Sequence, residues 1–162
     1  MGHYIAGIVL PTGMVRNAKA LLPGIKSVEL PQESTILPIS AEYLDAVGDT
    51  SRVVEPFQFL TQHIAEVLRD YSADCGIVYI ETEYFGGVGT QCAAAWLNSQ
   101  MIFGPAESET TWDHSARQHM VSNGTPINDA LSAVGVEKEG ELDEFDSLHL
   151  GNYRTFDGLY DS

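Results

Sequence analysis

Two glutamates near the middle of the chain are the residues best placed to do chemistry. Glu81 and Glu83 lie in residues 75–85, a stretch whose strongly apolar first half predicts a strand. Alternate residues of a strand share one face, so the two carboxylates would lie about 7 Å apart on the same side. Such a pair could hold a divalent cation or divide general-acid and general-base roles, which makes Glu81 and Glu83 the candidate catalytic residues. The alternative is a strand end with a solvated face, where like charges need no ligand.

A glycine-rich turn follows this strand. Gly86, Gly87 and Gly89 allow the backbone to approach a ligand closely, and together with Gln91 they are the candidate ligand-binding residues. A phosphate-binding loop would require residues 91–97 to form a helix whose N-terminus receives the anion. The spacing matches neither the mononucleotide nor the dinucleotide glycine pattern, and no lysine follows. The simpler alternative is a hairpin turn in which the glycines supply positive φ angles.

Cysteine and histidine do not form a recognisable ligand set. Cys75 and Cys92 fit no paired metal or redox motif, and the five histidines are scattered along the chain. Cys92 follows the glycine turn, but neighbouring carboxylates would raise the pKa of its thiol rather than activate it. The sequence therefore predicts no cofactor and no metal ligands, and two free thiols favour a reducing, cytoplasmic compartment.

Net charge is the most unusual property of the composition. Eight basic residues face 23 acidic ones, which gives a formal net charge of -15. Phosphate backbones and anionic lipid surfaces repel such a protein, so we expect it to bind neither nucleic acid nor membranes. A basic protein partner would instead be steered toward it. The alternative is that the excess carboxylates only keep the protein dissolved in a crowded cytoplasm.

An acidic segment near the C-terminus is the strongest candidate for contact with a basic partner. Its acidic residues do not have the spacing of a calcium-binding loop. The apolar Phe145 and Leu148 lie among the charges, and apolar anchors ringed by charge are typical of interfaces. An ordinary solvated segment is the alternative. The candidate partner-binding residues are Glu137, Glu139, Glu141, Asp143, Glu144, Phe145 and Asp146.

Hydrophobic periodicity predicts an α+β fold in one domain that spans residues 1–162. We expect a mixed, mainly antiparallel sheet with three or four helices packed on it, and the acidic segment 136–162 packed on the same domain. Residues 105–124 are polar and lack a pattern, which predicts a long loop. No stretch resembles a membrane span or a secretory signal. The expected strands are 3–10, 26–30, 35–39, 75–85 and a hairpin of 91–97 with 101–103, and the expected helices are 14–22, 40–47, 57–71 and 125–134.

Four stretches of the sequence carry a resemblance. They are residues 1–5, the segment YIETEYFGGVGTQ at 79–91, residues 126–128 and residues 143–146. Together they resemble a group of small bacterial cytosolic proteins of unassigned function. The resemblance implies a bacterial, single-domain protein, and it brings no catalytic residue with it.

Two hypotheses of function follow. The first is an acidic interaction protein, such as an immunity protein or an inhibitor of a basic partner. The second is a small enzyme that uses Glu81 and Glu83 beside the Gly86–Gly89 turn, with or without a metal ion. The absence of a cofactor motif and the net charge of -15 favour the first hypothesis over an enzyme. The oligomeric state is left open.

Overall fold

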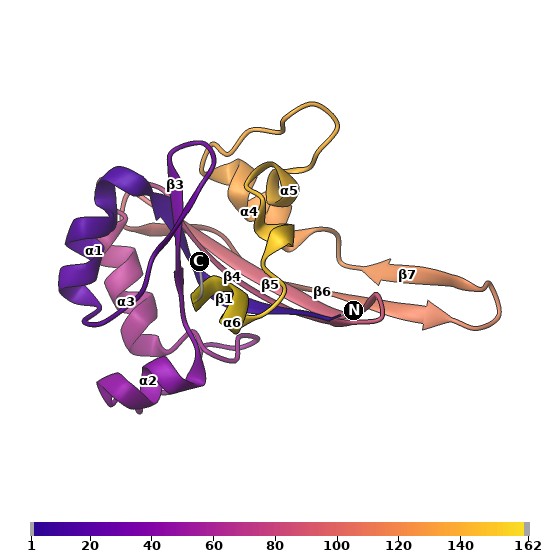
Figure 1. Ribbon diagram of the computed structural model, residues 1–162, viewed down its shortest axis with the longest axis horizontal. Helices are drawn as coiled ribbons and strands as arrows, with labels where there is room; N and C mark the ends of the chain where they lie inside the picture. The colour runs from indigo at the N-terminus through magenta and orange to yellow at the C-terminus, as the bar shows by residue number, and fades with distance from the viewer. Residues whose placement is uncertain (1, 161–162) are drawn as a thin grey trace.

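One antiparallel sheet organises the protein, as the computed structural model of residues 2–160 shows (Figure 1). Its strand order is β2-β3-β1-β4-β5-β6-β7, so most neighbours in the sheet are also neighbours in the sequence. The strands are β1 (His3–Pro11), β2 (Val28–Leu30), β3 (Ser34–Pro38), β4 (Ile77–Phe85), β5 (Val88–Leu97), β6 (Gln100–Asp113) and β7 (Gln118–Ser122).

Helices cover both faces of this sheet. The predicted α+β class is confirmed, and within residues 2–160 there are six α-helices rather than three or four, because the C-terminal segment adds two short ones. The helices are α1 (Val15–Leu21), α2 (Ala41–Val47), α3 (Gln62–Tyr71), α4 (Pro126–Ala133), α5 (Glu144–Ser147) and α6 (Phe156–Tyr160), with 3-10 turns η1 (Thr12–Met14) and η2 (Leu150–Asn152).

Strand β1 lies inside the sheet, between β3 and β4. Its run of apolar residues from Ile5 to Leu10 is buried, as expected for a strand covered on both faces. Gly7 is required at the contact with β3, because a Cβ atom there would lie 2.8 Å from the carbonyl oxygen of Leu37. The close approach of β1 and β3 therefore depends on a residue without a side chain.

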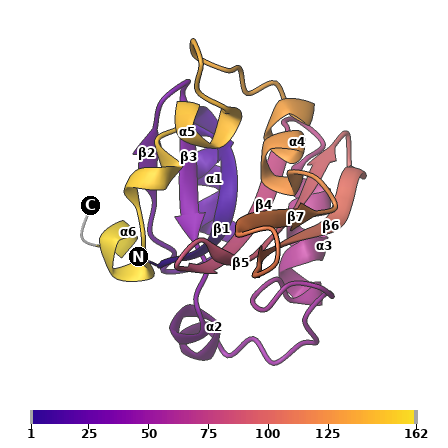
Figure 2. The ribbon, with the colours of Figure 1, turned by 90° about the vertical axis from the view of Figure 1, so that its right-hand side faces the viewer.

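Each face of the sheet has its own apolar core. We call the side covered by α1, α2 and α3 face A, and the side covered by α4 and the C-terminal segment face B (Figure 2). Ile8 and Tyr79 point to face A and meet Ile64 and Leu68 of α3. On face B the strand residues meet Leu131 of α4. The protein is thus a three-layer arrangement with the sheet in the middle.

Two tight turns set the register of the central hairpins. Gly86 and Gly87 both have positive φ angles and join β4 to β5. Asn98 and Ser99 also have positive φ angles and join β5 to β6, which confirms the hairpin predicted there.

The helix predicted over residues 57–71 begins later than expected. Thr61 is its N-cap, and the Thr61 hydroxyl accepts a hydrogen bond from the N–H of Ile64 at 3.1 Å. Phe57 and Leu60 are buried as the pattern indicated, but they lie in a loop. The N–H groups of Gln58 and Phe59 in this loop bond to the carboxylate of Glu81 on the sheet.

The prediction of a long loop over residues 105–124 is wrong. Most of this stretch forms the second half of β6 and all of β7. Both faces of this hairpin are largely exposed, so its strands lack the apolar alternation that usually identifies a strand. Figure 1 shows the hairpin extending far beyond the rest of the sheet.

The C-terminal segment packs against face B. Leu148, Leu150 and Leu159 are almost completely buried there beside Ile5 and Ile80. Short helices and turns interrupt the segment, so its apolar residues reach the sheet without a regular period. None of the helices within residues 2–160 has the length and apolar character needed to cross a membrane.

Replacing Leu148 with alanine should show that this segment is part of the core. The side chain has no exposed surface, so Leu148→Ala should lower the free energy of unfolding by about 2–5 kcal/mol. Leu142→Ala is the matched control, because Leu142 belongs to the same segment and is 44% exposed. Its effect should stay within about 0.5 kcal/mol. Equal effects in urea denaturation would contradict the packing described here.

Candidate functional site

Glu81 is a buried carboxylate at the centre of face A. It is 7% exposed and lies where β4 passes beneath the loop before α3. The N–H of Gln58 donates to Oε1 at 2.7 Å, and the N–H of Phe59 donates to Oε2 at 2.8 Å. The hydroxyl of Tyr79 also donates to Oε2 at 2.8 Å. Glu81 therefore fixes the loop that precedes α3 to the sheet.

Burial and hydrogen bonding shift the pKa of Glu81 in opposite directions. Burial raises the pKa of its carboxyl group, and the hydrogen bonds from Gln58, Phe59 and Tyr79 partly counter that increase. The same burial, with Glu81 nearby, holds the pKa of Tyr79 well above its usual value. Burial also raises the pKa of Cys92, and Glu81 and Glu107 add to the effect. The Cys92 thiol is thus kept protonated, as the sequence predicted.

Glu83 shares face A with Glu81 but is exposed. Its Oε2 accepts a hydrogen bond from Gln58 Nε2 at 2.6 Å. The strand register places Glu107 opposite Cys92 and Glu109 opposite Thr90, so two further carboxylates lie on this face. The pair predicted from the sequence is one part of an acidic area of four carboxylates.

The contacts around Glu81 and Glu83 are those of a structural pair. Within residues 2–160 no group of three or more His, Cys, Asp or Glu side chains is placed to hold a metal ion. The cavity beside the pair has a volume of only about 50 Å³. Because Gln58 bonds to both carboxylates, the geometry is typical of a structural clamp. The enzyme hypothesis stays an untested prediction.

The predicted ligand-binding residues fall into two places. Gly86 and Gly87 form the exposed turn at the end of β4, and Gly87 lies against His119, since a Cβ atom there would be 2.8 Å from His119 Nε2. Gly89 lies where a Cβ atom would meet the carbonyl oxygen of Glu83 at 1.9 Å. Residues 91–97 belong to strand β5 and not to a helix, so the phosphate-loop alternative is wrong.

Gln91 points to face B and takes part in a polar network. Its Oε1 accepts from the N–H of Ile127 at 3.1 Å, and its Nε2 donates to the hydroxyl of Tyr84 at 3.2 Å. It is therefore separated from Glu81 and Glu83 by the sheet. It holds the start of α4 onto β5.

The network continues around a cavity of about 140 Å³. Asn128 donates to Asp143 Oδ2 at 3.1 Å, and Asn128 Oδ1 accepts from the N–H of Phe145 at 2.9 Å. The four stretches that carry the resemblance, residues 1–5, 79–91, 126–128 and 143–146, all contribute to this cavity. Its side chains bond to one another, which indicates a structural joint. The residues that line it are His3, Thr82, Tyr84, Gln91, Ile127, Asn128, Asp143 and Phe145.

His3 belongs to this joint. Its Nε2 lies 3.4 Å from the carbonyl oxygen of Leu150, and its Nδ1 lies 2.6 Å from the hydroxyl of Thr82. Because a carbonyl can only accept, Nε2 carries the proton and Nδ1 accepts from Thr82. Burial lowers the pKa of His3, and the Leu150 carbonyl and Asp146 oppose that change while Arg154 adds to it. His3 is thus a histidine at the start of β1 whose two ring nitrogens both have hydrogen-bond partners.

Some residues of the acidic segment stabilise its fold, and others lie on the protein surface. Asp143 caps α5, with Oδ1 accepting from the N–H of Asp146 at 2.9 Å, and Glu144 is buried. Phe145 is half-buried and packs edge-on against the ring of His3. The other members of the predicted set, Glu137, Glu139, Glu141 and Asp146, are exposed.

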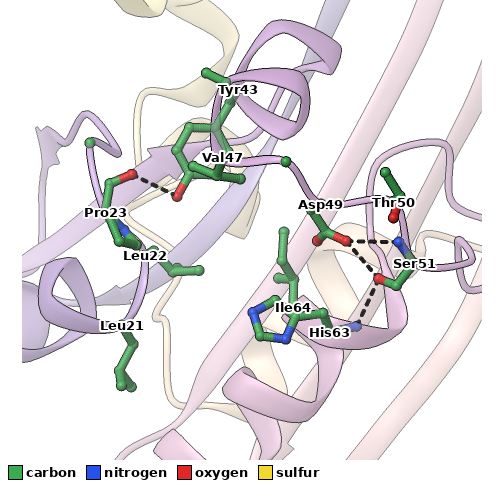
Figure 3. Close-up of a pocket in the computed structure, with 13 residues that line it drawn as sticks. Leu21, Leu22, Pro23, Tyr43, Val47, Asp49, Thr50, Ser51, His63 and Ile64 are labelled. Atoms are coloured by element: carbon green, nitrogen blue, oxygen red, sulfur yellow. Dashed lines mark hydrogen bonds between the residues drawn. The ribbon is translucent and has the colours of Figure 1, made fainter.

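An apolar groove that the sequence did not reveal lies between α1, α2 and the start of α3 (Figure 3). Its volume is about 790 Å³, and Leu21 and Val47 lie exposed along it. Figure 3 shows Asp49, Ser51 and His63 at one end. In the sequence, the only indication of this groove is the turn Asp49-Thr50-Ser51 after Gly48. That pattern is typical of an ordinary turn capped by a side chain.

The Asp49, Ser51 and His63 cluster is not a nucleophilic triad. The Ser51 hydroxyl donates to Asp49 Oδ1 at 2.7 Å and accepts from the backbone N–H of His63 at 3.3 Å. Partial burial would raise the pKa of Asp49, but hydrogen bonds from Thr61 and Ser51 outweigh it and hold the pKa below its usual value. The cluster therefore closes the turn between α2 and α3.

No family model, curated protein or solved structure matches this chain.

Glu81→Gln should destabilise the protein. An amide retains one acceptor oxygen but places an NH2 group against a buried backbone donor. The loss should be about 1–3 kcal/mol in the free energy of unfolding. Glu83→Gln is the matched control because it makes the same change at an exposed position, and its effect should stay within about 0.5 kcal/mol. Denaturant unfolding measures both, and equal values would contradict the clamp.

The stability of the protein should depend on the protonation of His3. Because the folded-state pKa lies below the ordinary value of 6.5, the unfolded chain takes up the proton at a higher pH than the folded chain does. The free energy of unfolding should therefore fall as the pH drops below about 6.5, and the contribution is retained above that value. His3→Gln should remove this part of the pH dependence, whereas the exposed control His114→Gln should not. If the free energy of unfolding depends on pH identically in the wild type and in His3→Gln, the folded structure does not oppose protonation of His3.

Proposed function

We propose that this protein is an acidic interaction protein that binds a basic protein partner, as an immunity protein or an inhibitor does. The observation that carries the proposal is an excess of carboxylates that the fold itself does not neutralise. The acidic residues outnumber the basic ones by 23 to 8.

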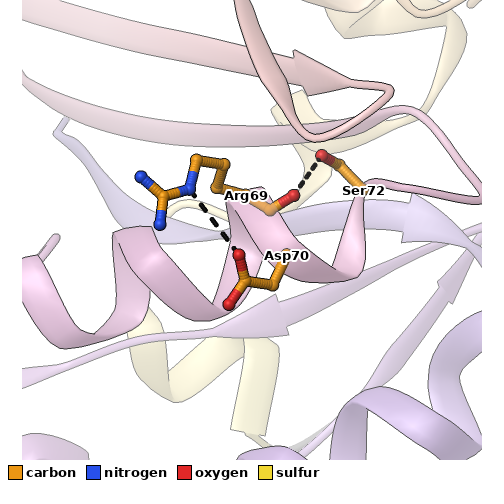
Figure 4. Close-up of polar contacts among 3 residues, drawn as sticks. All are labelled: Arg69, Asp70 and Ser72. Atoms are coloured by element: carbon orange, nitrogen blue, oxygen red, sulfur yellow. Dashed lines mark hydrogen bonds and ion pairs between the residues drawn. The ribbon is translucent and has the colours of Figure 1, made fainter.

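Intramolecular ion pairing accounts for little of this charge. Among residues 2–160, one ion pair joins two described side chains, Arg69 and Asp70 of α3, with 3.6 Å between Nε and Oδ1 (Figure 4). Both side chains are more than half exposed, and such a pair contributes little to stability. The backbone of Arg69 is also used locally, because its carbonyl accepts from the Ser72 hydroxyl at 2.7 Å. Most carboxylates are therefore available to an external partner.

Three of these carboxylates are displayed on a loop whose backbone is fixed. Gln32 bonds twice to the main chain of Glu137, donating through Nε2 at 2.8 Å and accepting through Oε1 at 3.0 Å. The N–H of Glu139 donates to the Ser147 hydroxyl at 2.9 Å. The side chains of Glu137, Glu139 and Glu141 remain exposed. A fixed backbone lowers the entropy lost on binding, which favours recognition by this loop.

The β2–β3 turn extends the same acidic surface. Gln32 lies in this turn, so its bonds to Glu137 bring the exposed Glu33 to the neighbourhood of the loop. Asp143, Glu144 and Phe145 support the loop from inside and are not part of the surface proposed here. We define the acidic loop surface as Glu33, Glu137, Glu139 and Glu141.

Charge reversal on the acidic loop surface should slow association with the partner. The triple variant Glu137→Lys, Glu139→Lys and Glu141→Lys alters side chains that point to solvent, so the fold should be unchanged. Because opposite charges steer encounter, the association rate should fall roughly tenfold or more at low salt, and less at high salt. The partner is first captured on the immobilised wild type from host lysate and identified by mass spectrometry, and rates are then measured with the purified pair.

A second triple variant separates local recognition from net charge. Glu42→Lys, Asp45→Lys and Glu66→Lys make the same charge change at exposed positions of α2 and α3. Association should be slowed much less by this control. Equal slowing by both variants would show that the acidic loop surface acts only through its contribution to the net charge and is not a specific recognition site. Failure to retain any basic protein at low salt would refute the proposed function.

A further inference from the structure

Beyond the pairing of Thr110 with Gly89 at the start of β5, the hairpin of β6 and β7 is a two-stranded ribbon with no helix packed on it. It projects beyond the helical layers in Figure 1 and points toward the viewer in Figure 2. Every residue of β7 is exposed, including Met120 and Val121, and Trp112 on β6 is 41% exposed. The ring of Trp112 packs edge-on against that of His119 across the ribbon. A two-stranded ribbon is only marginally stable in water, and a third strand would strengthen it.

The outer edge of β7 is open. Strand β7 pairs with β6, and among residues 2–160 no further backbone hydrogen bond joins β7 to another part of the chain. The opposite edge of the sheet is protected, because β2 has only three residues, carries Glu29 and is followed by Pro31. Strand β7 has five residues and none of these protecting features.

Charge is also missing from β7. Its sequence, Gln118-His119-Met120-Val121-Ser122, contains no Asp, Glu, Lys or Arg. This is notable in a chain with a net charge of -15. A basic partner would find no carboxylate on this strand, whereas an identical strand would meet no like charge.

We propose that a second copy of this chain pairs with β7, antiparallel and centred on Met120, so that two ribbons form one four-stranded sheet. Two-fold symmetry then places Met120 opposite its counterpart and His119 opposite Val121 of the other copy. Trp112, His119 and Val121 share face B, so the two sets form one continuous apolar and aromatic surface. The proposal is independent of the partner proposed above.

The projecting ribbon also explains how two strongly acidic copies could associate. Contact through the ribbons keeps the two helical bodies apart, and charges farther apart than about 10 Å are largely screened at ordinary salt. Five paired residues in each copy make a small interface, so the dimer should depend on concentration. Added salt should strengthen it, because the net repulsion is screened while the pairing of uncharged strands is retained.

Sedimentation velocity tests the proposal directly. The wild type should sediment as a mixture of the 17.7 kDa monomer and its dimer, with more dimer at higher concentration and higher salt. Val121→Lys and Met120→Lys should both be monomeric, because each places like charges near the two-fold axis. Leu21→Lys is the matched control, since it adds the same charge at an exposed apolar residue of the groove, and it should dimerise like the wild type. Circular dichroism confirms that each variant is folded.

Crosslinking tests the register. Met120→Cys should form a disulfide between copies under mild oxidation, because paired Cα atoms across antiparallel strands are about 4.5–5.5 Å apart. Thr111→Cys is the control on the same face of β6. It would lie three strand spacings, about 14 Å, from its counterpart and should not crosslink. Cys75 and Cys92 are buried and should remain reduced in both. A wild type that is monomeric at high salt, or crosslinking by Thr111→Cys but not by Met120→Cys, would overturn the proposal.

Discussion

The pairing of β1 with β4 is the constraint on which the rest of the structure depends. Seven residue pairs join the two strands, and both strands are buried for most of their length. A strand pair that is apolar on both faces cannot leave either face to solvent. One set of helices therefore covers face A, and the chain from α4 onward must return to cover face B. The three-layer arrangement follows from this requirement.

Polar residues inside the protein act as joints between these layers. Glu81 holds the loop before α3 on face A, and the group of His3, Gln91 and Asn128 holds α4 and the C-terminal segment on face B. Within the residues that the structure describes, no buried side-chain nitrogen or oxygen lacks a hydrogen-bond partner. Acidic side chains thus serve two purposes here, since a few of them bind the chain to itself and the remainder face outward.

The sequence predicted the regular parts of the fold and missed those that tertiary contacts determine. Strand β1, helix α2 and the hairpin of β5 with β6 each have a local signal, and all three were predicted correctly. The start of α3 was misplaced because Phe57 and Leu60 continue the apolar spacing of the helix, although they lie in a loop that Glu81, distant in sequence, holds against the sheet. The β6–β7 hairpin was missed because neither of its faces is covered by other elements.

The same distinction applies to the candidate site. Strand alternation correctly placed Glu81 and Glu83 on one face, but it carries no information on which carboxylate is buried. Gln91 was grouped with the glycine turn because it is near in sequence, although its side chain lies on the other side of the sheet. The division of the acidic segment into Glu137, Glu139 and Glu141 outside and Glu144 inside depends on Gln32 and Ser147, which no local pattern connects to it.

The return of the C-terminal segment to face B has a consequence for synthesis. The strands that carry Ile5, Ile36 and Ile80 leave the ribosome long before Leu148, Leu150 and Leu159 are made. During that interval the nascent chain can cover face A with α1, α2 and α3, while face B stays uncovered. The finished fold is therefore reached only after Leu148, Leu150 and Leu159 have left the ribosome. A chaperone bound near the ribosomal exit would have a defined apolar surface to protect until then.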